Sequence, residues 1–100
     1  MTITIGAEIV IDTNVKLDGE SRVTLSGAGT HRIFSIDEDL AGVELHDLAV
    51  TGGSAKFGGG IRIGPSAIAI LRNVDVSGNE AVRGGGGIYI NEEAKAVDGG

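Results

Sequence analysis

The 100-residue chain contains no cysteine and no tryptophan, and it has only one proline and three aromatic residues. The lack of cysteine excludes a disulfide framework and any thiolate metal site. Basic residues are also scarce, because eight Lys and Arg stand against fourteen Asp and Glu, for a net charge of −6. A nucleic-acid binder needs a positive stripe that replaces the counterions of phosphates, so we expect no nucleic-acid partner.

Long apolar runs are missing as well, since charged residues or glycines interrupt them, and we expect no membrane span. The first five residues lack the basic and apolar regions of a signal peptide. In contrast, glycine, isoleucine and valine are abundant, with 18, 12 and 9 residues. The stiff β-branched side chains favour strands and exclude simple disorder.

Three families of short segments recur along the chain in a fixed order, with a nearly constant spacing within each family. The first family lies at 8–12, 33–37, 60–64 and 87–91, the second at 15–17, 43–45 and 69–71, and the third at 23–27, 48–52 and 74–78. Each segment alternates apolar and variable residues, the pattern of a strand with one buried face. A repeat of this length built from strands alone predicts a solenoid.

We therefore predict an all-β, right-handed parallel β-helix of three to four coils, each of about 26 residues with three short strands. It forms a single domain over residues 1–100, which we expect to be a fragment of a longer solenoid. Glycines gather near 52–60 and 78–87, where we expect corner loops that bulge from the surface. The predicted core is Ile9, Ile11, Leu17, Val23, Leu25, Phe34, Ile36, Val43, Leu45, Leu48, Val50, Ile61, Ile63, Val74, Val76, Ile88 and Ile90.

One string of residues is similar to a known family. Residues 71–81 (LRNVDVSGNEA), followed by GGGGIYI at 84–90, resemble the β-helix repeats of bacterial surface proteins, and residues 45–61 hold a second copy. The family includes polymorphic outer-membrane proteins and autotransporter passengers, and it has a pectate-lyase-like fold. The resemblance, over about residues 9–91, implies an extracellular or cell-surface location within a longer protein. Adhesins and polysaccharide-degrading enzymes share this fold, so the fold alone does not choose a function.

The predicted outward positions in the middle of the strands bring no two carboxylates into one column, so we predict no catalytic site, no cofactor and no metal site. The acidic run 37–39 lacks the ligand spacing of a calcium site and is typical of a solvated turn. His31 and His46 fall at different places in the coil, and we expect both to be exposed turn residues.

Two columns of polar residues are expected to be structural. Ser26, Thr51 and Ser77 recur once per coil, which indicates a hydrogen-bonded ladder at a corner rather than a nucleophile. Asp47 and Asn73 lie between the second and third segments, where we expect their side chains to satisfy backbone donors.

A face for a partner or ligand is predicted around Arg62 and Tyr89. Both occupy the middle of a first-family segment, so they should be neighbours on one outward sheet, with Lys56 and Arg83 on the adjoining loop. Tyr and Arg are enriched at protein interfaces.

Three functions fit these observations. The first is a non-catalytic structural or adhesive segment of a bacterial surface or secreted protein, with a carbohydrate or a host or surface protein as partner. The second is a remnant of a polysaccharide lyase or hydrolase. The third is a module that stacks end to end on itself or on further coils, because only residues 1–7 and 92–100 are left to cap the open strand edges. The acidic excess lies entirely in residues 1–50, at −6, while residues 51–100 are neutral.

Overall fold

The computed structural model describes residues 1–84, 86–91 and 94–98, and its regular structure is entirely β-strand. In chain order the strands are β1 (Thr2–Thr4), β2 (Ile9–Ile11), β3 (Lys16–Ser26), β4 (Phe34–Ile36), β5 (Val43–Thr51), β6 (Ser54–Phe57), β7 (Ile61–Ile63), β8 (Ile68–Val76), β9 (Glu80–Gly84), β10 (Ile88–Ile90) and β11 (Lys95–Asp98). Within these described ranges no helix is long and apolar enough to cross a membrane.

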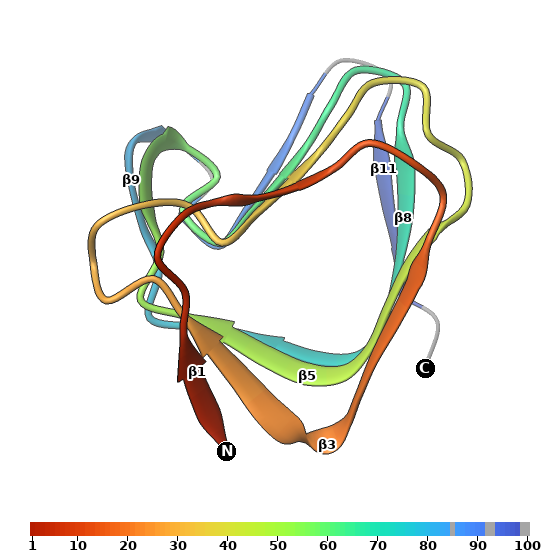
Figure 1. Ribbon diagram of the computed structural model, residues 1–100. Helices are drawn as coiled ribbons and strands as arrows, with labels where there is room; N and C mark the ends of the chain where they lie inside the picture. Colours follow the sequence, from red (N-terminus) through yellow and green to blue (C-terminus); the bar gives the residue numbers. More distant parts are fainter. Residues whose placement is uncertain (85, 92–93, 99–100) are drawn as a thin grey trace.

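The strands stack as a parallel β-solenoid of about four turns, which lie about 26 residues apart. Successive turns overlay one another in a roughly triangular outline (Figure 1). From the first turn in front to the last turn behind, the chain runs clockwise, which is a right-handed winding. The predicted all-β parallel β-helix is confirmed.

Two sheets form the walls of the solenoid, with strand orders β1-β3-β5-β8-β11 and β10-β7-β4-β2. In the second sheet Ile11 pairs with Ile36, Ile36 with Ile63, and Ile63 with Ile90. The repeated segments therefore stack like residue on like residue. Branched side chains pack well in such cross-strand columns, which explains why isoleucine and valine dominate the composition.

The second and third repeated segments of a coil were predicted as separate strands, but they join into one bent strand. β5 bends at Asp47 and β8 bends at Asn73, each with φ +53°. Asp and Asn adopt this left-handed conformation more readily than most residues. The amide of Asn73 donates a hydrogen bond to Oδ1 of Asp47 at 2.9 Å. These residues thus shape the bend and bond to each other, instead of satisfying backbone donors as predicted.

The glycine-rich connections protrude from the outline, as β9 shows in Figure 1. They are more regular than the predicted loops, because β6 pairs with β9 in a small parallel sheet. Glycine is required at its entry, since a Cβ on Gly53 would lie 1.9 Å from the carbonyl oxygen of Gly59. Asn79 bridges this corner: its Oδ1 accepts from the Gly53 N–H at 2.8 Å, and its Nδ2 donates to the carbonyls of Val50 and Ser77 at 3.1 and 3.0 Å.

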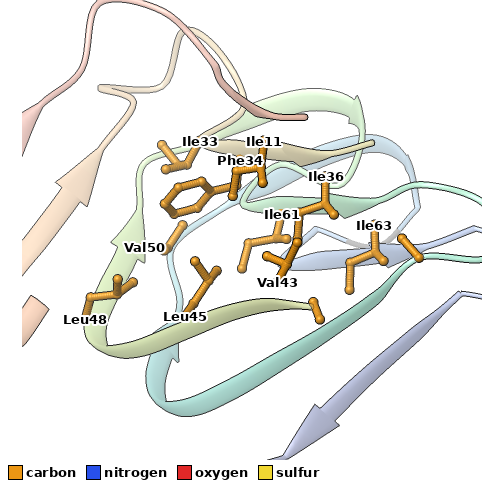
Figure 2. Close-up of a cluster of buried hydrophobic side chains, with 12 residues drawn as sticks. Ile11, Ile33, Phe34, Ile36, Val43, Leu45, Leu48, Val50, Ile61 and Ile63 are labelled. Carbon is orange, nitrogen blue, oxygen red and sulfur yellow. The ribbon is translucent and has the colours of Figure 1, made fainter. Parts of the chain in front are cut away.

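The core fills the space between the two walls (Figure 2). Its buried members are Ile11, Ile33, Phe34, Ile36, Val43, Leu45, Leu48, Val50, Ile61, Ile63, Ala67 and Ala69. The predicted core list omitted Ile33, Ala67 and Ala69, which are all buried. It was wrong for Ile90, which is 47% exposed. Other predicted core residues of the first and last turns are only partly buried, because a neighbouring turn covers them on one side alone.

The N-terminal stretch adds a strand to the first turn. β1 pairs with the end of β3, with Ile3 beside Leu25. At the other end, β11 pairs with the first part of β8, from Ile68 to Leu71. The expected capping stretches therefore contribute strands that continue the sheets of the solenoid.

Candidate binding face

The outward side of the β10-β7-β4-β2 sheet carries a column of four side chains that pair in register, namely Val10, Ser35, Arg62 and Tyr89. The guanidinium of Arg62 lies over Ser35, with Nη1 3.5 Å from Oγ. This cover explains why Ser35 is buried although it points outward. Arg62 and Tyr89 are thus register neighbours on one outward sheet.

Tyr89 also contacts Phe57, the last residue of β6. Their ring centroids are 4.8 Å apart and their planes are inclined by 42°. Gly58 permits this approach, because it has φ +65° and a Cβ there would lie 3.0 Å from Cβ of Tyr89. Two of the three aromatic residues of the chain therefore form one pair beside Arg62.

Arg62 also lines a hollow of about 540 Å³, together with Asp12, Asp37, Glu38, Leu40 and Pro65. Asp12 and Asp37 directly follow β2 and β4, whose last residues pair in register. The two carboxylates therefore occupy equivalent positions in neighbouring turns. The sequence analysis predicted no column of paired carboxylates, but it considered only the middle positions of the strands. It therefore missed these two carboxylates, which lie just after the strand ends.

Of the four residues predicted to form a face, Arg62 and Tyr89 are register neighbours on the solenoid wall. The other two lie on the protruding sheet. Lys56 and Arg83 are both exposed, on β6 and β9 of the protruding sheet. Successive side chains of a strand point to opposite faces, so Lys56 faces away from Tyr89 while Phe57 contacts it. We use the term Arg62–Tyr89 face for Ser35, Arg62, Tyr89, Phe57 and the acidic hollow.

Arg32 fixes the protruding sheet to the stack, a role that the sequence analysis did not foresee. Its Nε donates to the carbonyl of Gly58 at 2.9 Å, and its Nη2 donates to that of Phe57 at 2.6 Å. Its Nη1 forms an ion pair with Glu8 of the preceding turn. The guanidinium fork thus holds the backbone of Phe57 in place.

The two histidines are not the exposed turn residues that were predicted. His46 lies within β5, its side chain is 9% exposed, and its Nε2 donates to Oε1 of Glu44 at 2.8 Å. The ring nitrogens of His31 lie 2.9 Å from the carbonyl oxygens of Ile5 and Arg32. Both rings therefore serve the fold. In the part of the chain that the structure describes, no three His, Asp or Glu residues are grouped to hold a metal ion.

The column of hydroxyl residues Ser26, Thr51 and Ser77 lies at a corner of the solenoid. Ser26 pairs in register with Thr51, and its Oγ accepts from the backbone N–H of Ala28 at 3.2 Å. The bonds between turns at this corner are carried by the backbone, from Gly27 N–H to the carbonyl of Thr51 at 3.1 Å. The acidic run 37–39 lies exposed after β4, with residues 38 and 39 in a turn, as expected.

No protein-family model matches this chain, and comparisons with curated proteins and with solved structures likewise give no significant match.

Proposed function

We propose that the chain is a non-catalytic adhesive segment of a bacterial surface or secreted protein, and that it binds carbohydrate through the Arg62–Tyr89 face. The observation that carries this proposal is the pairing of Tyr89 with Phe57 beside Arg62. Aromatic rings offer an apolar surface to the C–H face of a sugar ring. Guanidinium and carboxylate groups are planar and form paired hydrogen bonds with neighbouring hydroxyls.

The charges around the face favour a neutral polysaccharide over an acidic one. Asp12, Asp37 and Glu38 line the hollow next to the single cation Arg62. An acidic polymer would meet net repulsion there, whereas sugar hydroxyls can donate to the carboxylates and accept from the guanidinium.

The setting of the face also supports a binding role. Arg62 and Tyr89 lie on the strands of a solenoid wall, and the fork of Arg32 fixes Phe57. Side chains held on rigid elements lose little conformational entropy when a ligand binds.

The test is a binding screen on immobilised neutral and acidic polysaccharides with the purified chain. The double variant Arg62→Ala/Tyr89→Ala should lose at least about tenfold in affinity for the polysaccharide that binds best, since hot-spot residues each contribute a factor of this order. The matched control Lys56→Ala/Arg83→Ala removes two exposed cations of the protruding sheet, and its affinity should stay within about twofold. Equal losses in both variants, or no binding of any polysaccharide, would refute the proposal.

A second candidate, a remnant of a polysaccharide lyase or hydrolase, is favoured by the three carboxylates and the arginine around one hollow. Such enzymes need acid and base groups within reach of one sugar linkage. Turnover of an acidic or neutral glycan that is lost in Asp37→Asn would support this function over the adhesive one. Binding without turnover would support the adhesive function.

A further inference from the structure

At both ends of the stack, the described residues leave strand edges without a strand partner. We define the first-turn face as β1, β2 and the adjoining part of β3, and the last-turn face as β10, β11 and the end of β8; in Figure 1 the former lies in front and the latter behind. β2 and β10 are the outer strands of their sheet. We propose that a second copy of this chain docks head to tail, with its first-turn face on the last-turn face of its neighbour.

The first-turn face is hollowed and apolar. A hollow of about 200 Å³ opens there between Ile9, Leu17, Val23, Leu25, Phe34 and Leu48, with Asp18 and Gly19 at its side. Apolar surface of this kind is stabilised when another layer of side chains covers it.

The register of the solenoid identifies a second copy as the layer that fits. Ile11 pairs with Ile36, Ile36 with Ile63 and Ile63 with Ile90, so a copy placed one turn further would bring its Ile11 beside Ile90. The same extension pairs Ile3 with Val76, Ile9 with Ile88, Val10 with Tyr89 and Leu17 with Asp98 of the neighbouring copy. Four of these five pairs are apolar or aromatic.

The strands at the two faces also complement each other. β11 covers only the first part of β8, so among the described residues no strand pairs with Val74–Val76 on the last-turn side. β1 pairs with the corresponding second part of β3 at the opposite face. In a head-to-tail stack, β1 of the next copy therefore takes the position beside Val74–Val76.

The exposed large apolar side chains are concentrated at the same faces. In the described ranges these side chains are Met1, Ile3, Val10, Val82 and Ile90; Ile3, Val10 and Ile90 lie on strands of the two faces, and Met1 directly precedes β1. The molecule measures 31 × 30 × 21 Å, and its 21 Å extent matches the height of five stacked strands. Each end face therefore measures at most about 31 × 30 Å.

Strand topology favours head-to-tail over head-to-head contact. The segment Val74–Val76, which no strand of the described residues covers, lies on the last-turn face, and the complementary β1 lies on the first-turn face. A head-to-tail contact does not close on itself, so it generates open rows of copies.

The test uses one variant for each face and measures mass by size exclusion with light scattering. Val10→Asp alters the first-turn face and Ile90→Asp alters the last-turn face; both positions are about half exposed, so circular dichroism should show the wild-type fold. The wild-type chain should grow in mass with concentration beyond a dimer, while each variant alone stays monomeric. An equimolar mixture of the two should form a dimer and nothing larger, because one intact face of each kind remains.

Val82→Asp is the matched control, because Val82 is 83% exposed on β9 of the protruding sheet, outside the strands that define the two faces, and this variant should associate as the wild type does. Three results would overturn the proposal. The first is a wild-type chain that is monomeric at every concentration, which would leave a coil of another polypeptide as the occupant. The second is an equimolar mixture that stays monomeric. The third is self-association of Ile90→Asp alone, which would indicate head-to-head contact.

Discussion

Asn79 offers a sharp test of how the glycine-rich corner is held. Its side chain joins three backbone groups, accepting from Gly53 through Oδ1 and donating to Val50 and Ser77 through Nδ2. Asn79→Asp has nearly the same shape and keeps the acceptor, but it replaces the donating amide by an oxygen that faces two carbonyl oxygens. The substitution therefore removes the two donated hydrogen bonds and adds one negative charge, which the control substitution below also adds.

The expected cost follows from those two bonds. Each contributes roughly 0.5–1.5 kcal/mol net, so their loss should lower the free energy of unfolding by about 2 kcal/mol. The carbonyl of Val50 retains a second donor, the Ser77 N–H at 3.1 Å, which keeps the cost from rising further. For a domain of this size the loss corresponds to a decrease in Tm of roughly 8–16 °C.

Asn14→Asp is the matched control, measured by urea and thermal unfolding at the same protein concentration. Oδ1 of Asn14 accepts from the Gly42 N–H of the next turn at 2.8 Å, and the site is exposed. The same chemical change there keeps the acceptor bond, so stability should change by less than about 0.5 kcal/mol. Equal effects of the two substitutions would show that the amide of Asn79 contributes no stability through its donated bonds.

Three further substitutions test other parts of the structure. Gly53→Ala should lower the free energy of unfolding by more than about 3 kcal/mol, because the new Cβ meets the backbone of Gly59, whereas Gly6→Ala, with nothing within 4 Å of its Cβ, should be nearly neutral in the same urea titration. Arg32→Lys cannot reproduce the fork to Gly58 and Phe57, so hydrogen exchange at the amides of β6 should become faster while exchange in β5 is unchanged; equal rates in β6 would contradict this role. Phe34→Ala should cost about 3–5 kcal/mol in thermal or urea unfolding because its ring is fully buried, and a loss below about 1 kcal/mol would refute the placement of the core.

The stacking of the sheets could be predicted because it depends on inward residues that recur with the repeat. Ile36, Ile63 and Ile90 occupy one column, and their even spacing is visible in the sequence. β1 was missed because the interval from Ile3 to its partner Leu25 is shorter than the corresponding interval in the other turns. A comparison of segments at a fixed spacing does not detect such a short first turn.

The apolar pattern could not distinguish one bent strand from two separate strands. Both arrangements place apolar residues inward on each side of Asp47, and only the backbone conformation at that residue distinguishes them. A signal for β6 and β9 was present, since Ala55 and Ala81 pair in register one turn apart. The surrounding glycines concealed it, because glycine is depleted in strands and indicates loops.

The binding face could be predicted only where it follows the repeat. Arg62 and Tyr89 occupy equivalent positions one turn apart, so their proximity is a consequence of the register. Phe57 and Tyr89 are separated by more than one turn but less than two, so they do not occupy equivalent positions of the repeat. Their contact depends on how far the protruding sheet folds back over β10, and the sequence pattern carries no information about that distance.

The division between inward and outward columns explains how one repeat can hold a fold and a binding face together. The inward column beside the face is isoleucine in four successive turns, from Ile11 to Ile90, and it fixes the backbone. The outward column beside it changes from Val10 through Ser35 and Arg62 to Tyr89. Outward side chains can vary with little effect on the core, so chemical specificity is concentrated where the repeat is least regular. A second copy stacked in register would place its Val10 beside Tyr89, and this would extend the same outward column from one copy to the next.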